Sequence, residues 1–389
     1  MAIYFISVAF IYIYGVITNA NKTQTKRKTF IIVSFGILIL IAALRAPDVG
    51  LDLVGHYVKK YTDITLYDWK SLGNFSAITG YEIGYCYFTK ILSVINPDVQ
   101  FYIVVCAILI YGAIGYFIYK ESDDVIMSTL LMIFTCTYYM CMTMIRQGIA
   151  FSIILIGYAN LDHSSRNIKD YIKFALWIIL ASTFHDSAML CISMIIFDRF
   201  RFTRKHIVYG MIAMVALFLY YQRIYLFVVG FLNGGENNYE RYMISLTESR
   251  GNINIQSVSN FLITFFAFLL GYYVLVWNKK KVKTFRTVEE NKYSLERNEG
   301  FLLYMVLIAS LCRLLIFKMN IINRFTYYFI PFLFILYPHA IYSVPLRSNR
   351  IVLRRIVYLL FLSYFVWMTV NFAGILYGTV PYKFFWQNY

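Results

Sequence analysis

Charged residues are scarce in this chain. Only 14% of its 389 residues are Asp, Glu, Lys or Arg and 60% are hydrophobic, whereas globular proteins have about 25% charged and about 45–50% apolar residues. The apolar residues form stretches of the length that a helix needs to cross a bilayer, about 20 residues. This composition excludes an ordinary water-soluble domain and predicts an all-α, polytopic integral membrane protein.

Several chemical signatures are also missing. The cysteines lie inside apolar stretches, with no Cys-x-x-Cys pair and no zinc-like spacing to a histidine; they are Cys86, Cys106, Cys136, Cys141, Cys191 and Cys312. The chain has no Walker loop, no dinucleotide-binding glycine pattern, no nucleophile elbow and no His-Glu-x-x-His sequence. We therefore expect no disulfide, no bound metal and no cofactor.

Acidic residues are fewer than basic ones, 20 against 36, which gives a net charge of +16. In a soluble chain this excess would suggest a nucleic-acid partner. In a membrane protein, Lys and Arg collect in the cytoplasmic loops. Topology therefore explains the charge, and we expect no nucleic-acid partner.

The apolar stretches predict about twelve transmembrane helices. They lie at residues 1–18, 29–45, 81–96, 100–119, 125–143, 146–161, 171–196, 206–232, 257–277, 300–318, 323–343 and 352–375. Two are ambiguous, because 81–96 is short and begins with Glu82, and 171–196 carries Phe184-His185-Asp186-Ser187 in its middle. Either segment could instead be broken or re-entrant, as is tolerated where backbone lines a protein cavity. The count would then fall to about ten.

The positions of the basic residues predict the orientation. No Lys or Arg precedes the first stretch, whereas Lys22, Lys26, Arg27 and Lys28 follow it. This places both termini outside, and the loops then assigned to the cytoplasm carry roughly twice as many Lys and Arg as the others. We predict a single transmembrane domain over 1–389, with long outward loops at 46–80 and 233–256 and a basic cytoplasmic loop at 279–298.

Polar residues within or beside the spans are candidates for a functional site, because a charged side chain costs about 2.5–3.5 kcal/mol to insert. The groups that could move a proton are Asp52, Glu82 and His185. The groups that could bind a substrate are Arg45, Tyr57, Arg146, Gln147, Arg313, Arg324 and Tyr327. Structural alternatives exist: Arg45 could snorkel to the interface, Glu82 could stabilise a helix N-terminus, and His185 could be a satisfied core residue.

Arginine has a specific use at such a membrane surface. Its guanidinium binds phosphate oxygens through two parallel hydrogen bonds and stays charged at any physiological pH. Several buried arginines facing an outward cavity would therefore suit a lipid diphosphate.

Five short motifs follow one another along the chain. They are Arg45 with Val49-Gly50-x-Asp52 and Tyr57, then Glu82-x-Gly84-Tyr85, Arg146-Gln147-x-Ile149-Ala150, Phe184-His185-x-Ser187-Ala188 and Asn323-Arg324-x-x-Tyr327-Tyr328. In this order, over about residues 1–345, they resemble the EpsG family of Wzy-type polysaccharide polymerases. The chain departs from the family pattern at Leu51, where Thr is frequent, and at Ile83, where Pro is frequent.

The resemblance implies a glycosyltransferase in the bacterial cytoplasmic membrane. It would polymerise polyprenyl-diphosphate-linked oligosaccharide repeat units of an O-antigen, capsule or exopolysaccharide on the outer face, in contact with membrane lipids, a flippase and a chain-length regulator. The acceptor hydroxyl would lose its proton to Asp52, Glu82 or His185. Two alternatives are a flippase for the same lipid-linked unit and a membrane O-acyltransferase that acts on a glycan.

Overall fold

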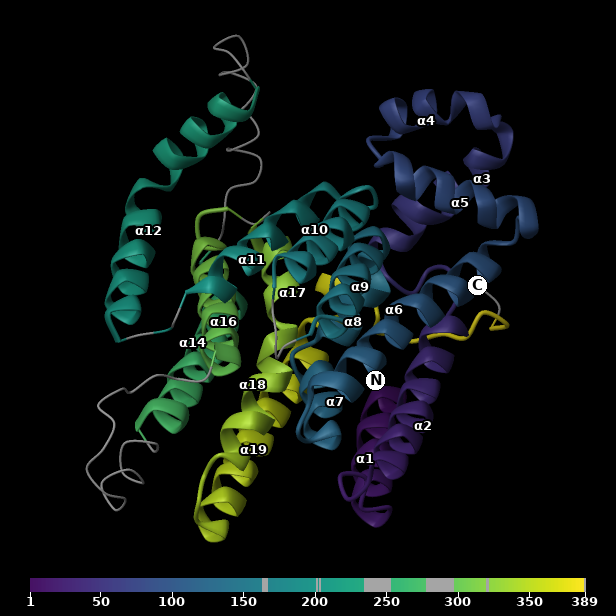
Figure 1. The fold of residues 1–389 in the computed structure, drawn as a ribbon. Coiled ribbons are helices and arrows are strands. Elements are labelled where there is room, and N and C mark those ends of the chain that lie inside the picture. The colour runs from purple at the N-terminus through teal and green to yellow at the C-terminus, as the bar shows by residue number, and fades with distance from the viewer. Residues whose placement is uncertain are drawn as a thin grey trace. The chain divides into compact units, whose positions relative to one another are not determined.

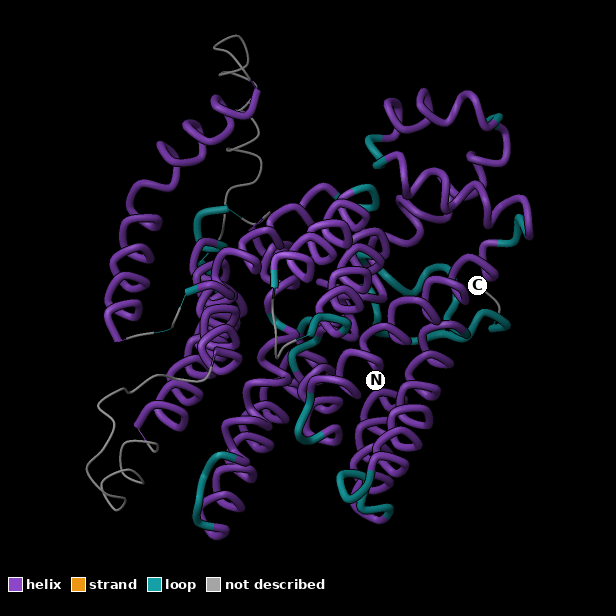
Figure 2. The backbone as a smooth tube through the Cα atoms, in the orientation of Figure 1, coloured by secondary structure: helices purple, strands orange, loops and turns teal. Residues whose placement is uncertain are grey.

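The computed structural model describes residues 1–162, 167–200, 202, 204–233, 253–277, 297–319 and 322–387. Within these ranges the regular secondary structure is helical, and β pairing is limited to an isolated bridge between Arg45 and Phe384 (Figure 2). The prediction of an all-α chain is confirmed.

The chain forms two compact units, of which the first comprises residues 1–192 and 346–389. Helix α2 packs against α6, α6 against α9, and α9 against α10, so segments far apart in sequence build this unit (Figure 1). Its helices are α1 (Ala2–Ile17), α2 (Gln24–Ala43), the π-helix η1 (Leu53–Val58), α3 (Lys59–Asp63), η2 (Ile64–Leu66), η3 (Trp69–Ser71), α4 (Leu72–Thr79), α5 (Ile83–Ile95), α6 (Val99–Glu121), α7 (Val125–Phe134), α8 (Thr137–Thr143), α9 (Ile145–Ala159), α10 (Ile168–Ser182), η4 (Asp186–Cys191), α19 (Arg347–Asn371) and α20 (Ala373–Tyr377).

The second unit comprises residues 193–345. Helix α16 is its centre and packs against α12, α14, α17 and α18. The helices are α11 (Ile192–Arg199), α12 (Arg204–Asn233), α14 (Ile255–Tyr272), the π-helix η6 (Tyr273–Trp277), α16 (Arg297–Leu315), α17 (Asn323–Phe329) and α18 (Pro331–Tyr342). That both units belong to a single transmembrane domain stays a prediction.

Short polar side chains start several helices of the first unit. Asp98 accepts a hydrogen bond from the backbone N–H of Gln100 at the start of α6, and Asp124 accepts one from Met127 at the start of α7. Such N-caps satisfy backbone donors that have no partner inside the helix. The predicted spans 100–119 and 125–143 therefore begin where these caps stand.

In the part of the chain that the structure describes, fewer helices than predicted are long enough to cross a bilayer. Among the described residues, four helices meet the length and hydropathy that a span requires: Val99–Glu121, Ile255–Leu275, Asn298–Leu315 and Arg347–Asn371. The bent pairs α7–α8 and α17–α18, with bends of 57° and 42°, raise this number to six. The prediction of twelve spans is therefore not confirmed. The sides of the membrane on which the termini and loops lie stay predictions.

The breaks in the apolar stretches explain the difference. Helix α7 ends before Cys136, which has a left-handed backbone with φ of +60°, so the apolar segment 125–143 divides into two short helices. Helix α5 has only 13 residues, fewer than the roughly 20 that a span needs. Hydropathy does not detect such interruptions, because the residues on both sides remain apolar.

The structure bears differently on the remaining segments that the sequence predicted. The structure favours the broken alternative for 171–196, because α10 ends at Ser182 and the chain is extended at His185 before η4 begins. Residues 46–80 are mostly helical. The predicted loops 233–256 and 279–298 lie almost entirely outside the described residues.

Candidate active site

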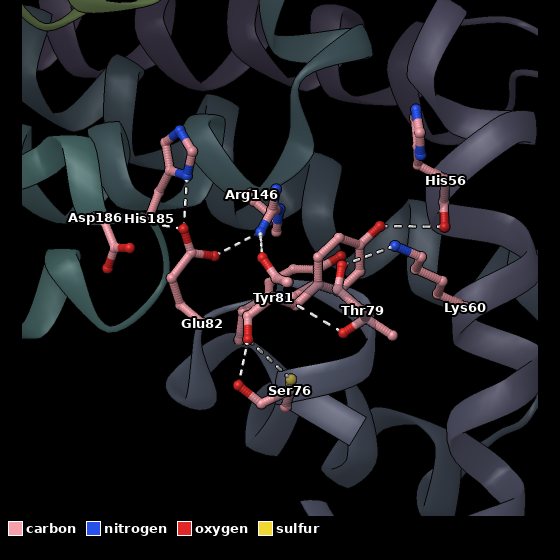
Figure 3. A network of polar contacts seen from close by, with 12 residues as sticks. His56, Lys60, Ser76, Thr79, Tyr81, Glu82, Arg146, His185 and Asp186 are labelled. Carbon is pink, nitrogen blue, oxygen red and sulfur yellow. Dashed lines mark hydrogen bonds and ion pairs between the residues drawn. The ribbon is translucent and has the colours of Figure 1, made fainter. Parts of the chain in front are cut away.

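Glu82 joins two predicted site residues that are distant in sequence. Its Oε2 lies 2.6 Å from Nη1 of Arg146, and its Oε1 lies 2.9 Å from Nδ1 of His185 (Figure 3). The backbone N–H of Asp186 donates a third hydrogen bond, of 3.1 Å, to Oε1. The side chains of Glu82, Arg146 and His185 are only 11%, 17% and 15% exposed. The three residues form a largely buried polar cluster, which we call the Glu82 cluster.

A close backbone approach brings Glu82 to His185. The backbone N–H of Tyr85 donates to the carbonyl of Thr183, two residues before His185. At Gly84, an added Cβ would lie 2.3 Å from Oγ1 and 2.8 Å from the carbonyl oxygen of Thr183. Only glycine fits at this contact, which explains the glycine two residues after Glu82 in the second motif.

The turn before Glu82 directs its side chain toward the cluster. Gly80 ends α4 in a left-handed conformation with φ of +66°, and Glu82 is extended at the start of α5. The Glu82 side chain does not cap α5, since its oxygens accept from Arg146, His185 and Asp186. These hydrogen bonds therefore argue against the alternative in which Glu82 only stabilises the N-terminus of a helix.

Arg146 is held in place from two sides. Its guanidinium carbon lies 4.1 Å from the centre of the Tyr81 ring, and Nη1 also donates to the carbonyl of Gly80 at 3.3 Å. Its backbone N–H makes a long hydrogen bond of 3.5 Å to the hydroxyl of Tyr57. Nε has no hydrogen-bond partner among the described residues. This nitrogen is therefore a buried donor that no described residue satisfies.

The surroundings keep Glu82 ionised. Burial raises the pKa of the Glu82 carboxyl, but the hydrogen bond from His185 and the positive charge of Arg146 lower it by more, so the pKa lies below the ordinary value of 4.5. A carboxylate whose pKa is lowered is a poorer proton acceptor at neutral pH. This argues against Glu82 as the base and leaves the other two candidates open.

Asp52 lies near the cluster without an ion pair. It is half-buried, and no described residue forms a salt bridge with it. Burial raises the pKa of Tyr57 and Tyr81, and the negative charge of Asp52 adds to both shifts. Asp52 is therefore close enough to Tyr57 and Tyr81 to act on them electrostatically.

Residues 378–385 hold the turn that carries Asp52. The N–H of Gly50 donates to the carbonyl of Gly378, that of Ala46 to Lys383, and that of Phe385 to Leu44. Gly50 has φ of +127°, and an added Cβ there would lie 3.0 Å from the carbonyl oxygen of Met142. Asp48 and Lys383 form an ion pair of 2.7 Å in the same region. The first motif is thus a turn fixed by backbone contacts.

The remaining predicted residues have different positions. Tyr57 is buried and stacks on Tyr81 with ring centres 6.2 Å apart, and Gln147 is buried next to Arg146 on α9. Arg45 is buried, and its Nε and Nη1 have no hydrogen-bond partner among the described residues. In the second unit, Arg313 is buried on α16, Arg324 is exposed on α17 and Tyr327 is buried.

Sequence reasoning missed Tyr81 and Lys60. The Nζ of Lys60 lies 4.1 Å from the centre of the Tyr81 ring, the same ring that Arg146 contacts. Tyr81 could have been found, because it immediately precedes Glu82, the first residue of the second motif. Lys60 carried no local signal, since a lysine in a loop is usually explained by topology.

The described residues contain no group of three or more His, Cys, Asp or Glu side chains that could hold a metal ion. The expectation that no metal is needed remains a prediction.

The apolar helices and the buried polar cluster define a helical membrane protein with a candidate catalytic centre. Comparison with protein families then identifies the group: residues 28–384 match the EpsG family, and the chain belongs to it. Members of this family are Wzy-type polymerases. Comparisons with curated proteins and with solved structures gave no match. The family predicted from the five motifs is thus confirmed, while the roles of individual residues stay predictions.

Proposed function

We propose that the chain polymerises oligosaccharide repeat units carried on polyprenyl diphosphate, at the outer face of the bacterial cytoplasmic membrane. Membership of a family of Wzy-type polymerases supports polysaccharide synthesis broadly. The observation that carries the specific proposal is the hydrogen bond between Glu82 and Nδ1 of His185.

This hydrogen bond fixes the chemistry of the imidazole. A carboxylate only accepts hydrogen bonds, so Nδ1 of His185 must carry a proton and donate it. In the neutral ring, Nε2 then holds a lone pair, and it has no hydrogen-bond partner among the described residues. An imidazole oriented through Nδ1 with Nε2 available can act as a general base. Glu82 acts through His185 and is a positioning residue.

Arg146 supplies the second requirement of the reaction, a cation for the leaving diphosphate. Glycosyl transfer develops negative charge on the departing phosphate oxygen, and a fixed guanidinium stabilises it without reorganisation. The Tyr81 ring and Glu82 hold the guanidinium of Arg146 in place.

The proposed reaction transfers the growing glycan from polyprenyl diphosphate to an acceptor sugar hydroxyl. His185 Nε2 takes the proton from an acceptor sugar hydroxyl, and that oxygen attacks the anomeric carbon of the growing glycan. The bond between this carbon and the diphosphate oxygen breaks with its electron pair, and polyprenyl diphosphate leaves beside Arg146. The new glycosidic bond lengthens the glycan by one repeat. The lipid-linked unit would be supplied by a separate flippase, and a chain-length regulator would be a further partner.

Replacing His185 tests the proposal. Full-length protein in lipid vesicles, given a polyprenyl-diphosphate-linked repeat unit, should produce a ladder of polymers on a gel. His185→Ala should slow elongation by about 10²–10⁴-fold, the usual contribution of a general base. His56→Ala is a matched control, because His56 is exposed and joins the network only through its backbone carbonyl. A full ladder from His185→Ala would contradict the proposal.

Cells distinguish this function from transport. If the chain is a polymerase, His185→Ala cells should still display single, unextended repeats on their surface, since another protein exports them. If the chain were a flippase, no repeat would reach the surface. Protein levels must be equal in the cells compared.

A further inference from the structure

Lys60 and Arg146 share one aromatic ring. Lys60 lies on α3, and its Nζ is 4.1 Å from the centre of the Tyr81 ring, as is the guanidinium carbon of Arg146 (Figure 3). The ammonium also donates to the carbonyl of Thr79 at 3.1 Å. The Tyr81 hydroxyl donates to the carbonyl of His56, which ties the ring to η1. Two cations from different helices thus contact the same aromatic ring.

Arg146 and Lys60 differ in whether an acidic side chain pairs with them. Arg146 is paired with Glu82, at 2.6 Å, which offsets part of its charge. Lys60 forms no ion pair with any described residue, although Asp63 follows it on the same helix. Of the two cations at the Tyr81 ring, only Lys60 therefore has a charge that no direct partner neutralises.

The surroundings disfavour that charge. Burial lowers the pKa of Lys60, and the positive charge of Arg146 lowers it further, while Asp63 opposes the shift. An anion bound near both cations would remove this penalty. One ammonium N–H is used by Thr79, and a protonated lysine has two more donors.

We propose that Lys60 is the second cation of a diphosphate site whose first cation is Arg146, and that Lys60 makes the site prefer a diphosphate lipid to a monophosphate lipid. The inference rests on the proposed function, since it concerns the leaving group of that reaction. The ligand class is a polyprenyl diphosphate. Arg146 contacts one phosphate and Lys60 the other, because two phosphates carry more charge than the partly neutralised Arg146 can match.

Binding of lipids without glycan tests the site. Full-length protein in detergent is titrated with polyprenyl diphosphate and with polyprenyl monophosphate of the same chain length. Lys60→Gln should weaken diphosphate binding about ten-fold, as expected for the loss of a charge-assisted contact. It should leave monophosphate binding within about two-fold. Lys60→Arg should keep the preference, because the cation remains.

Lys59→Gln is the matched control. Lys59 is the preceding residue on the same helix, is exposed, and has no contact with the Tyr81 ring among the described residues. It makes the same change in net charge and should leave both affinities unchanged. An equal loss for both lipids in Lys60→Gln, no loss for either, or the same loss in Lys59→Gln would overturn the proposal. If Lys60→Gln does not fold, Lys60→Met keeps the length of the stem and gives the same comparison.

The two proposals can fail separately, since the binding measurement needs no acceptor and no turnover. Polymerisation by the wild type, with a diphosphate preference unaffected by Lys60→Gln, would sink the Lys60 site and leave the proposed function intact. A Lys60-dependent diphosphate preference without polymerisation would leave the site and remove the function.

Discussion

Oε1 of Glu82 lies 2.9 Å from Nδ1 of His185, although 103 residues separate them in the chain. The other carboxylate oxygen holds Arg146, which is 64 residues away. A single carboxylate thus orients both the proposed base and the proposed diphosphate ligand.

Removing the charge of Glu82 should separate binding from turnover. Glu82→Gln leaves Arg146 without its counter-ion, so the site becomes more positive and polyprenyl diphosphate should bind more tightly. Turnover should fall about 10²-fold, since His185 loses the group that orients it. Lipid titration and single-turnover elongation measure the two effects. Weaker diphosphate binding together with slower turnover would instead indicate a purely structural role.

Glu82 should also make stability depend on pH. Its pKa in the folded protein is below the ordinary value, so its stabilising contribution is present above the unfolded pKa and is lost as pH falls through the folded pKa. Wild type should therefore melt higher than Glu82→Gln at pH 6, and the difference should shrink below about pH 4. Melting curves of both proteins in one detergent test this, and a difference that does not shrink as the pH falls would contradict it.

Gly84 should tolerate no side chain. Gly84→Ala places a methyl group against Thr183, which must push α5 away from the end of α10 and separate Glu82 from His185. Since one of the contacts is to the Thr183 backbone, Thr183→Ala should not restore activity. Gly73→Ala is the control, because nothing lies within 4 Å of a Cβ at that helical position. Elongation by Gly84→Ala at the wild-type rate would show that the contact is not needed.

Asp52 is the alternative base, and its replacement tests the assignment. If His185 takes the proton, Asp52→Asn should reduce elongation by no more than about ten-fold, well short of the loss of a general base. The rate constants of Asp52→Asn and His185→Ala, measured with saturating substrate, give the comparison. A larger loss in Asp52→Asn would transfer the role to Asp52.

The predicted orientation can be tested by cysteine labelling. In a background without the six native cysteines, Lys70→Cys in loop 46–80 should react with an impermeant reagent in intact cells, while Lys283→Cys should react only after lysis. Lys70 is exposed, and Lys283 lies outside the described residues. Labelling of position 283 from outside would reverse the topology.

Sequence reasoning found the chemical groups of the site better than their arrangement. Glu82, Arg146 and His185 stand out because charge is rare in an apolar chain, and all three meet in the structure. That Glu82 would hold both partners could not be deduced, since their meeting depends on tertiary packing and on the Gly84–Thr183 contact. Lys60 escaped notice for a similar reason, because its importance comes from the position of Tyr81.

The transmembrane spans also depend on backbone detail that the sequence does not reveal. Apolar composition predicted helices, and the described residues contain them, but the left-handed residue Cys136 interrupts a stretch that hydropathy treats as continuous. A single backbone conformation divides a span without changing its mean hydropathy. The length of an apolar stretch in the sequence therefore does not by itself show that one continuous helix fills it.

The backbone contacts between residues 44–50 and 378–385 have a consequence for biosynthesis. The turn that carries Asp52 is made early in translation, but its partners leave the ribosome more than three hundred residues later. The nascent chain therefore cannot complete this turn until α19 and α20 have been synthesised. Premature termination near residue 377 would leave the Glu82 cluster's own residues intact and yet deprive the Asp52 turn of its support.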